Sequence, residues 1–163
     1  MKTFTLPKTN PPSYIQNGRS RLEVAQIIDI EFLRKLPPGT FGRAWADFVD
    51  ENQLQAFTTA PRRQQLHEGI HVLTGYGTDA LGEAELQAFL LGAKLRLVNL
   101  ILLISQVRAI HQKQRCYIIW KRLWAAYQRG RLSLLDPDDW QPELLWELPL
   151  EQVQTLFRIK SKS

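Results

Sequence analysis

The chain has 163 residues, of which 44% are hydrophobic, and a formal net charge of +5. This length favours one well-packed domain over two, and the hydrophobic content excludes a wholly disordered chain. The single cysteine, Cys116, excludes an internal disulfide and indicates a reducing compartment.

Residues 1–20 are rich in Pro, Asn and Ser and predict an N-terminal arm, because Asn10-Pro11-Pro12 does not fit within a helix. We expect a single helical domain over residues 21–163. The arm has no clear signal or transit peptide, and no apolar run reaches the length of about 18 to 20 residues that a membrane span requires.

The first half of the domain predicts two helices. Apolar residues recur at helical spacing from Leu22 to Leu36, and Pro37-Pro38-Gly39 ends that element, although alternation around Asp29 also fits a strand. Thr40 is a suitable N-cap for the second helix. Its apolar face consists of Phe41, Trp45, Phe48 and Val49.

The third expected helix begins near Pro61 and contains His67, Glu68 and His71. The histidines lie one turn apart and Glu68 is about 100° round from His67, so the three side chains can converge. Thr74-Gly75-Tyr76-Gly77 is a helix-stop sequence, and Thr78 or Asp79 can cap a following helix that carries Glu83. If the two helices fold back on each other, two imidazoles and two carboxylates form a normal ligand set for a divalent metal.

The next predicted helix runs from about Asp79 to beyond Val107 and is apolar on most faces. Such a helix is central in the core, part of an oligomer interface or the wall of an apolar cavity. A fifth helix over about Gln114 to Gln128 aligns Trp120, Trp124 and Tyr127 as expected core residues and ends at Gly130, and a last helix starts at Pro149 with Leu150, Val153 and Phe157. The pattern predicts an all-α bundle of about six to seven helices around a central long apolar helix.

Charge is unevenly distributed along the chain. No Asp or Glu occurs between Leu86 and Leu135, whereas this stretch contains nine Lys or Arg residues. The asymmetry indicates either a solvated basic face or an anionic partner, such as phospholipid head groups, a phosphate-bearing lipid or an acidic protein. Nucleic acid is not expected, because the aromatic residues are not interleaved with base-reading side chains.

Three interpretations of the histidine segment are open. His67-Glu68-Gly69-Ile70-His71 satisfies the H-E-x-x-H pattern of zinc proteases, but no convincing strand borders it and the third ligand would be Glu83, only 12 residues after His71. The histidines could instead be structural residues with local hydrogen bonds. A metal site beside an apolar wall is the third interpretation.

The segment from His67 to Gly77, with Gly82-Glu83, resembles the H-D-x-x-H, eleven residues, E signature of the coenzyme Q biosynthesis protein four family. Further resemblance lies in the segment from Leu36 to Phe48, in Tyr127-Gln128-Arg129-Gly130, and in Asp139-Trp140 followed by Pro149-Leu150-Glu151-Gln152-Val153. These blocks cover most of the chain from about residue 30 to its end, in the order of the family.

This resemblance implies an all-helical, metal-binding protein of ubiquinone biosynthesis that holds a prenylated lipid, associates peripherally with membranes and forms a homodimer. It assigns His67, Glu68, His71 and Glu83 as metal ligands and catalytic residues, with zinc expected first and iron or manganese as alternatives. The apolar helix would receive the prenyl tail at Leu90, Leu97, Leu100, Ile101 and Ile104. The family also implies oxidative decarboxylation of the prenylated benzoquinone precursor at ring carbon C1.

Glu68 departs from the family's Asp by one methylene, which moves the carboxylate and affects ligand geometry. A non-catalytic prenyl-lipid-binding scaffold that organises other quinone biosynthesis enzymes is therefore the alternative to a metal-dependent enzyme. Either protein would be cytoplasmic and peripheral on the inner membrane of a bacterial cell.

Overall fold

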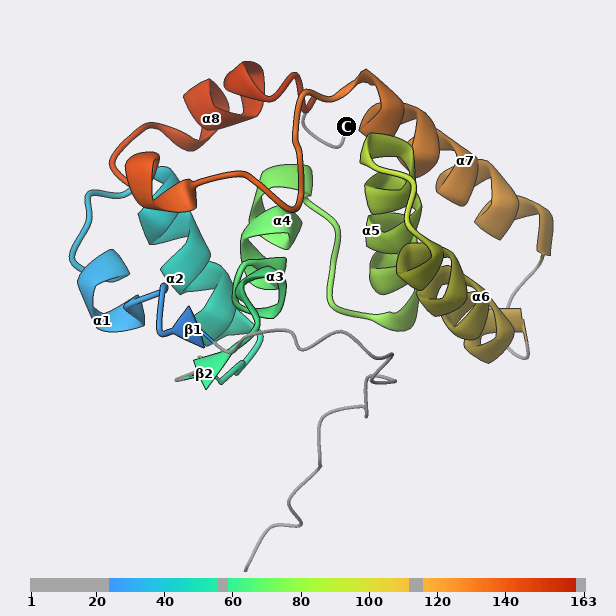
Figure 1. Ribbon diagram of the computed structural model, residues 1–163, viewed down its shortest axis with the longest axis horizontal. Helices are drawn as coiled ribbons and strands as arrows, with labels where there is room; N and C mark the ends of the chain where they lie inside the picture. Colours follow the sequence, from blue (N-terminus) through green and yellow to red (C-terminus); the bar gives the residue numbers. More distant parts are fainter. Residues whose placement is uncertain (1–23, 56–58, 112–115, 161–163) are drawn as a thin grey trace, which may run out of the picture.

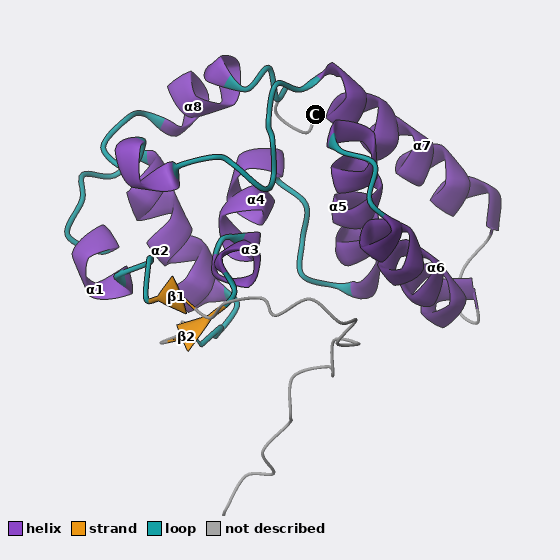
Figure 2. Ribbon diagram, viewed as in Figure 1, coloured by secondary structure: helices purple, strands orange, loops and turns teal. Residues whose placement is uncertain are grey.

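The computed structural model describes residues 24–55, 59–111 and 116–160, and the predicted arm at 1–20 lies outside them. In the described chain, eight α-helices and one short 3-10 helix accompany a pair of two-residue strands (Figure 2). The strands β1 (Val24–Ala25) and β2 (Thr59–Ala60) pair antiparallel, Val24 opposite Ala60. The predicted all-α fold is confirmed, with more and shorter helices than expected.

The helices form two groups that lie side by side in Figure 1. One group contains α1 (Ile30–Leu33), α2 (Phe41–Glu51), α3 (Arg62–Gln65), α4 (His67–Thr74), η1 (Pro142–Leu144) and α8 (Leu150–Leu156). The other contains α5 (Ala80–Ala93), α6 (Leu97–His111) and α7 (Cys116–Leu132). The chain crosses from the first group to the second between α4 and α5.

The prediction of one helix from Leu22 to Leu36 was wrong, because α1 is only four residues long. Residues before it are extended, with β1 paired to β2 and the Ile27 N–H donating to Gln65 Oε1 at 2.7 Å. Asp29 caps α1 through its side chain, which accepts from the Phe32 N–H. These partners outside the segment satisfy backbone groups that a longer helix would have paired internally.

Helix α2 is as predicted and carries the largest core side chains. Its N-cap Thr40 accepts from the Arg43 N–H, and Phe41, Trp45 and Val49 are buried. The first N–H groups of α2 are satisfied by the C-terminal segment, since Phe41 N donates to Leu148 O and Gly42 N to Trp146 O. The ring of Trp45 lies against Gly69 of α4, where an added Cβ would be 2.2 Å from a ring carbon.

The prediction of one long apolar helix was also wrong, because it is divided into α5 and α6 at Lys94, Leu95 and Arg96. Lys94 has extended backbone angles, φ −151° and ψ 113°. The Lys94 ammonium contacts the Asp136 carboxylate at 2.6 Å, and the Arg96 guanidinium contacts Asp138 at 2.5 Å. Ion pairs with a distant loop thus accompany a break that helical periodicity does not predict.

Helix α7 does not end at Gly130, contrary to prediction, but continues to Leu132. Gly130 serves close packing, since an added Cβ would lie 2.0 Å from the Phe89 carbonyl oxygen of α5. Gly92 of α5 serves the same purpose, since a Cβ added there would lie 2.1 Å from the Tyr127 carbonyl oxygen of α7. A bidentate pair between Arg122 and the buried Glu85, at 2.8 and 2.7 Å, joins the same two helices.

Part of the predicted core of α6 and α7 is exposed. Trp120 and Trp124 are 55% and 62% exposed, so their interpretation as core residues was wrong, and Trp124 stacks on the half-buried Tyr127. Leu95 and Leu97 at the helix break are 83% and 79% exposed. Within the described ranges, none of the helices combines the length and the hydropathy needed to cross a membrane.

Candidate metal centre

Local signals place the three site residues at the junction of the two helix groups. Gly75 ends α4 in the left-handed conformation, φ 72°, and donates its N–H to the His71 carbonyl oxygen at 2.7 Å. Asp79 starts α5 by accepting from the Gly82 N–H at 2.9 Å. Glu83 therefore lies in the first turn of α5, facing the histidines of α4.

The donor atoms of His67, His71 and Glu83 lie within 4.8 Å of one another. His71 Nε2 is 3.2 Å from His67 Nε2 and 3.1 Å from Glu83 Oε1, and His67 Nε2 is 3.5 Å from Glu83 Oε2. The predicted convergence of two imidazoles and a carboxylate from the next helix is thus present in the structure.

The environment of His71 orients its ring toward the cluster. The side chain is fully buried, at 0% exposure, and its Nδ1 lies 3.1 Å from the Tyr76 carbonyl oxygen. A carbonyl only accepts, so Nδ1 carries a proton and, in the neutral ring, the lone pair is on Nε2. Phe48 of α2 stacks on the imidazole at 5.6 Å, with an interplanar angle of 19°.

The cluster is strongly coupled electrostatically. Burial disfavours the charged form of His71, but its hydrogen bond to Glu83 and the charge of that carboxylate outweigh this effect and raise the pKa above 6.5. Burial likewise opposes ionisation of Glu83, yet hydrogen bonds from His67 and His71 lower its pKa to about 2. In the absence of a cation, the carboxylate is held ionised between the imidazoles.

This donor set fits a divalent cation. Ligands at about 2.0–2.1 Å from zinc in a tetrahedral site lie about 3.3 Å from one another. The two separations made by His71 Nε2, 3.2 Å to His67 Nε2 and 3.1 Å to Glu83 Oε1, are close to that value, whereas the 3.5 Å contact of His67 Nε2 is with the other carboxylate oxygen of Glu83. Two imidazoles and one carboxylate leave a position open for a substrate, and the same set also suits iron.

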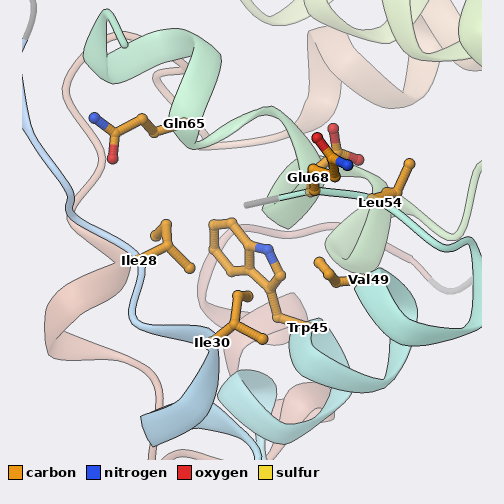
Figure 3. A pocket seen from close by; sticks show the side chains of 8 residues that line it. Ile28, Ile30, Trp45, Val49, Leu54, Gln65 and Glu68 are labelled. Carbon is orange, nitrogen blue, oxygen red and sulfur yellow. The ribbon is translucent and has the colours of Figure 1, made fainter. Parts of the chain in front are cut away.

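Glu68, the fourth predicted ligand, is not part of this cluster of donor atoms. It lines a small neighbouring cavity of about 20 Å³ with apolar residues of α2 and of the segment before α1. Figure 3 shows the Trp45 indole among the side chains that line this cavity, between Ile28 on one side and Glu68, Leu54 and Val49 on the other. The negative charge of Glu68 nevertheless contributes to the raised pKa of His71.

The residues predicted to bind lipid are divided between core and surface. Leu90 is 2% exposed and belongs to the hydrophobic core. Leu97, Leu100, Ile101 and Ile104 of α6 are exposed at 79%, 39%, 52% and 50%. They form an open apolar face, and the cavity of Figure 3 is lined by other elements.

Sequence reasoning did not identify the groups that support His71. Phe48 was expected only as a core residue, and the Tyr76 contact is made by a backbone carbonyl, which residue type does not reveal. The only signal was the turn after Gly75, which brings the chain back toward the end of α4.

Comparison with known proteins identifies relatives of the whole described fold. The family model for the coenzyme Q (ubiquinone) biosynthesis protein Coq4 matches residues 9–162. The mitochondrial ubiquinone biosynthesis protein COQ4 homolog of Bos taurus is 28% identical over 86% of this chain and 57% of its own length, and that of Danio rerio is 28% identical over 89% and 62%. The chain therefore spans somewhat more than half the length of these relatives.

A solved structure shares the fold. A crystal structure from Nostoc punctiforme PCC 73102, of a protein provisionally assigned to ubiquinone biosynthesis, superposes with a TM-score of 0.72 at 20% identity. The match covers 86% of this chain and 72% of that one. Since the family model covers nearly the whole sequence, the chain belongs to the Coq4 family of coenzyme Q (ubiquinone) biosynthesis proteins.

Proposed function

We propose that this protein is a metal-dependent enzyme of ubiquinone or related prenylquinone biosynthesis that oxidatively decarboxylates a prenylated benzoquinone precursor at ring carbon C1. The observation that carries this proposal is the convergence of His67, His71 and Glu83 at separations suited to one divalent cation. Membership of the Coq4 family supports the pathway.

The residues of the centre have separate tasks in this proposal. His67, His71 and Glu83 would hold the cation, and the Tyr76 carbonyl fixes the His71 ring so that Nε2 is presented. The bound cation would supply Lewis acidity toward an oxygen of the aromatic head group. Zinc is the first candidate for the cation. The proposed reaction oxidises the ring and therefore needs an external oxidant, and iron or manganese would suit such a reaction.

Glu68 and the two partly exposed ligands indicate where a head group would approach. His67 and Glu83 are 22% and 25% exposed, whereas His71 is closed off by Phe48. Glu68 follows His67 directly and lies near enough to influence the charge of His71. It could accept a proton at the cluster or become a fourth ligand through a side-chain rotation.

The exposed face of α6 supports action at a membrane surface. Leu97, Leu100, Ile101 and Ile104 present apolar side chains outside the core, where they could contact a prenyl tail or the acyl region of a bilayer. A cytoplasmic position on the inner membrane and a homodimer remain parts of this proposal.

Metal analysis of His71→Ala tests the catalytic proposal. Purified wild-type protein, prepared without chelators, should contain close to one equivalent of divalent metal, and His71→Ala should contain at least about tenfold less because one of three ligands is lost. Glu147→Gln, a change of an exposed residue, is the matched control and should retain the metal. Equal and negligible metal in all three proteins would contradict the proposal.

The alternative is a non-catalytic prenyl-lipid-binding scaffold for other quinone biosynthesis enzymes. The exposed Ile118, Trp120 and Trp124 of α7 favour it, since aromatic residues at a surface are frequent in protein interfaces. To separate the enzyme from the scaffold, each variant is expressed in a cell that lacks its own family member, and the production of quinone is measured. A scaffold would tolerate Glu83→Gln but fail with Trp124→Ser, and an enzyme would fail with Glu83→Gln.

A further inference from the structure

Arg129 of α7 connects the second helix group to the end of the histidine helix α4. Its Nη2 donates to the Thr74 carbonyl oxygen at 3.0 Å and also to the Lys160 carbonyl oxygen. Its guanidinium carbon lies over the Tyr76 ring, 4.9 Å from the ring centroid, which is within the range of a cation–π contact. One side chain thus contacts two residues of the turn that ends α4, Thr74 to Tyr76.

This turn in turn contacts His71 at two points. The Gly75 N–H donates to the His71 carbonyl oxygen at 2.7 Å, and the Tyr76 carbonyl oxygen lies 3.1 Å from His71 Nδ1. The first contact completes the helix, whereas the second determines which nitrogen of the ring carries the proton. A displacement of the turn would therefore change the orientation of the imidazole.

The Tyr76 side chain is held between two helices of the second group. It is 3% exposed, with Arg129 of α7 over its ring and Phe89 of α5 in an edge-to-face contact at 6.4 Å. Because a ring that is packed on both sides restricts the backbone of its own residue, these contacts keep the Tyr76 carbonyl oxygen at His71 Nδ1.

We infer that Arg129 is a positioning residue of the candidate metal centre, which holds the turn after α4 so that the Tyr76 carbonyl directs His71 Nε2 toward the cation. The inference rests on the proposed function for the cation, and on the contacts of Arg129 for the orientation of the ring. Arg129 acts through the turn and not as a ligand, because a guanidinium only donates hydrogen bonds and offers no lone pair to a metal.

A residue that only stabilises the end of α4 would act differently, and Gln154 of α8 provides the comparison. Its Nε2 donates to the Leu73 carbonyl oxygen at 3.0 Å, so it also binds a carbonyl at the end of α4 from a distant helix. Loss of either side chain removes one such hydrogen bond. Only the loss of Arg129 also removes the cation over the Tyr76 ring.

Four variants test the inference. Arg129→Gln removes the charge over the Tyr76 ring and shortens the side chain, whereas Arg129→Lys keeps a charge and most of the length. Tyr76→Leu removes the ring but keeps the backbone carbonyl and the contact of Arg129 with Thr74. Gln154→Met is the matched control, because it removes a hydrogen-bond donor at similar volume.

Two properties are measured in each protein. In the metal-free protein, proton–nitrogen correlation spectra of the imidazoles follow the exchange of the His71 Nδ1 proton with water, and the absence of this signal from His71→Ala assigns it. Competition with a chelator then measures the affinity for zinc.

We expect the Nδ1 proton of Arg129→Gln to exchange at least about tenfold faster than that of wild type, and its affinity for zinc to fall about tenfold. Arg129→Lys should restore most of both properties. Gln154→Met should resemble wild type in both, even where its melting temperature falls as far as that of Arg129→Gln. Equal losses in Gln154→Met and Arg129→Gln, or a wild-type exchange rate in Arg129→Gln, would overturn the inference.

Tyr76→Leu keeps the inference testable if Arg129→Gln does not fold. Its Nδ1 proton should also exchange faster than that of wild type, because the ring through which Arg129 holds the turn is gone. Slow exchange in this variant would show that the Tyr76 carbonyl stays in place without its ring, which would overturn the role of Arg129.

The two measurements separate this inference from the proposed function. Wild-type protein that binds no zinc would contradict the metal-dependent function, yet faster exchange in Arg129→Gln but not in Gln154→Met would still support the role of Arg129 in orienting His71. Wild-type and Arg129→Gln proteins that bind zinc equally tightly and exchange at the same rate would overturn the role of Arg129 alone.

Discussion

At the scale of single residues, the two histidines of the candidate centre differ more than their spacing indicates. His71 is fully buried between Phe48 and the Tyr76 carbonyl, whereas His67 is 22% exposed. One ring is therefore fixed by its surroundings and the other lies at the opening. The sequence predicted that His67, His71 and Glu83 converge, because one turn of α4 separates the histidines and the loop between α4 and α5 brings Glu83 to them.

The raised pKa of His71 makes metal binding dependent on pH. In the metal-free protein, a pKa above 6.5 means that the stabilisation by protonated His71 is present below pH 6.5 and is lost as the pH rises through the raised value. A metal needs the unprotonated Nε2, so the stabilisation that zinc provides should instead grow over that window. The affinity for zinc should fall about tenfold for each unit by which the pH is lowered, for each proton that the metal must displace.

Thermal melts with and without zinc, at about pH 6 and about pH 8, measure this effect. The rise in melting temperature caused by zinc should be larger at the higher pH. Glu83→Gln replaces the one carboxylate of the proposed ligand set, so in this variant the zinc effect should be small at both pH values. A zinc effect in wild type that is equal at both pH values would contradict the assignment of His71 as a ligand.

At the scale of helices, elements defined by local contacts were predicted well and elements defined by distant contacts were not. The caps of α2 and α5 use Thr40 and Asp79, whose side chains bind N–H groups only three residues away. The break between α5 and α6 instead involves Lys94 and Asp136, which are 42 residues apart. Periodicity reports a helix face and contains no information about such a partner.

Gly130 illustrates the same limit. A glycine near the end of a helical pattern usually indicates a C-terminus, but here it allows α5 and α7 to approach closely. Which of these two uses applies depends on Phe89 of α5, and no feature within α7 itself reveals that contact.

Substituting Gly130 by Ala should therefore destabilise the fold. Alanine is favoured over glycine inside a helix by about 1 kcal/mol, but its Cβ would lie 2.0 Å from the Phe89 carbonyl oxygen. Separating the helices should outweigh the helix preference and give a net loss of about 1–3 kcal/mol in the free energy of unfolding, measured by urea denaturation. Gly77→Ala, where the nearest atom to the Cβ is an Asp79 side-chain oxygen at 3.3 Å, should change stability much less. A more stable Gly130→Ala protein would show that the packing is looser than described.

At the scale of the whole molecule, the uneven charge of the sequence is partly neutralised in space. The acid-free stretch is flanked by Glu85 and Asp136, and these two acids pair with Arg122 and Lys94 inside it. Because these basic residues already have acidic partners within the fold, the acid-free stretch is weaker support for an external anionic partner than the sequence indicates. The apolar face of α6 is the stronger argument for a surface partner.

Asp138 connects the two helix groups. Its carboxylate pairs with Lys94 at 3.0 Å and Arg96 at 2.5 Å, at the start of α6, and with Arg63 of α3 at 3.6 Å. A loop before η1 thereby holds the break between α5 and α6 against the group that contains the histidines.

Asp138→Asn should loosen this connection. We expect about two- to fivefold faster tryptic cleavage after Lys94 and Arg96 under native conditions, because loss of a partly exposed ion-pair network lowers the cost of local opening only modestly. Asp139→Asn, at an exposed neighbouring carboxylate, is the matched control and should be cleaved at the wild-type rate. Unchanged cleavage of Asp138→Asn would mean that packing alone holds the break in place.

The contact of Trp45 with Gly69 has a practical consequence. Gly69 lies midway between His67 and His71, so a shift of that turn alters the surroundings of an indole that is only 1% exposed. Iodide in the buffer would quench the emission of the exposed Trp120 and Trp124 while sparing this ring. The fluorescence that remains comes from Trp45, from Trp140, whose ring stacks on that of Trp45 at 6.3 Å, and from the half-buried Trp146. Through Trp45 this emission should respond to occupancy of the histidine turn, without any label.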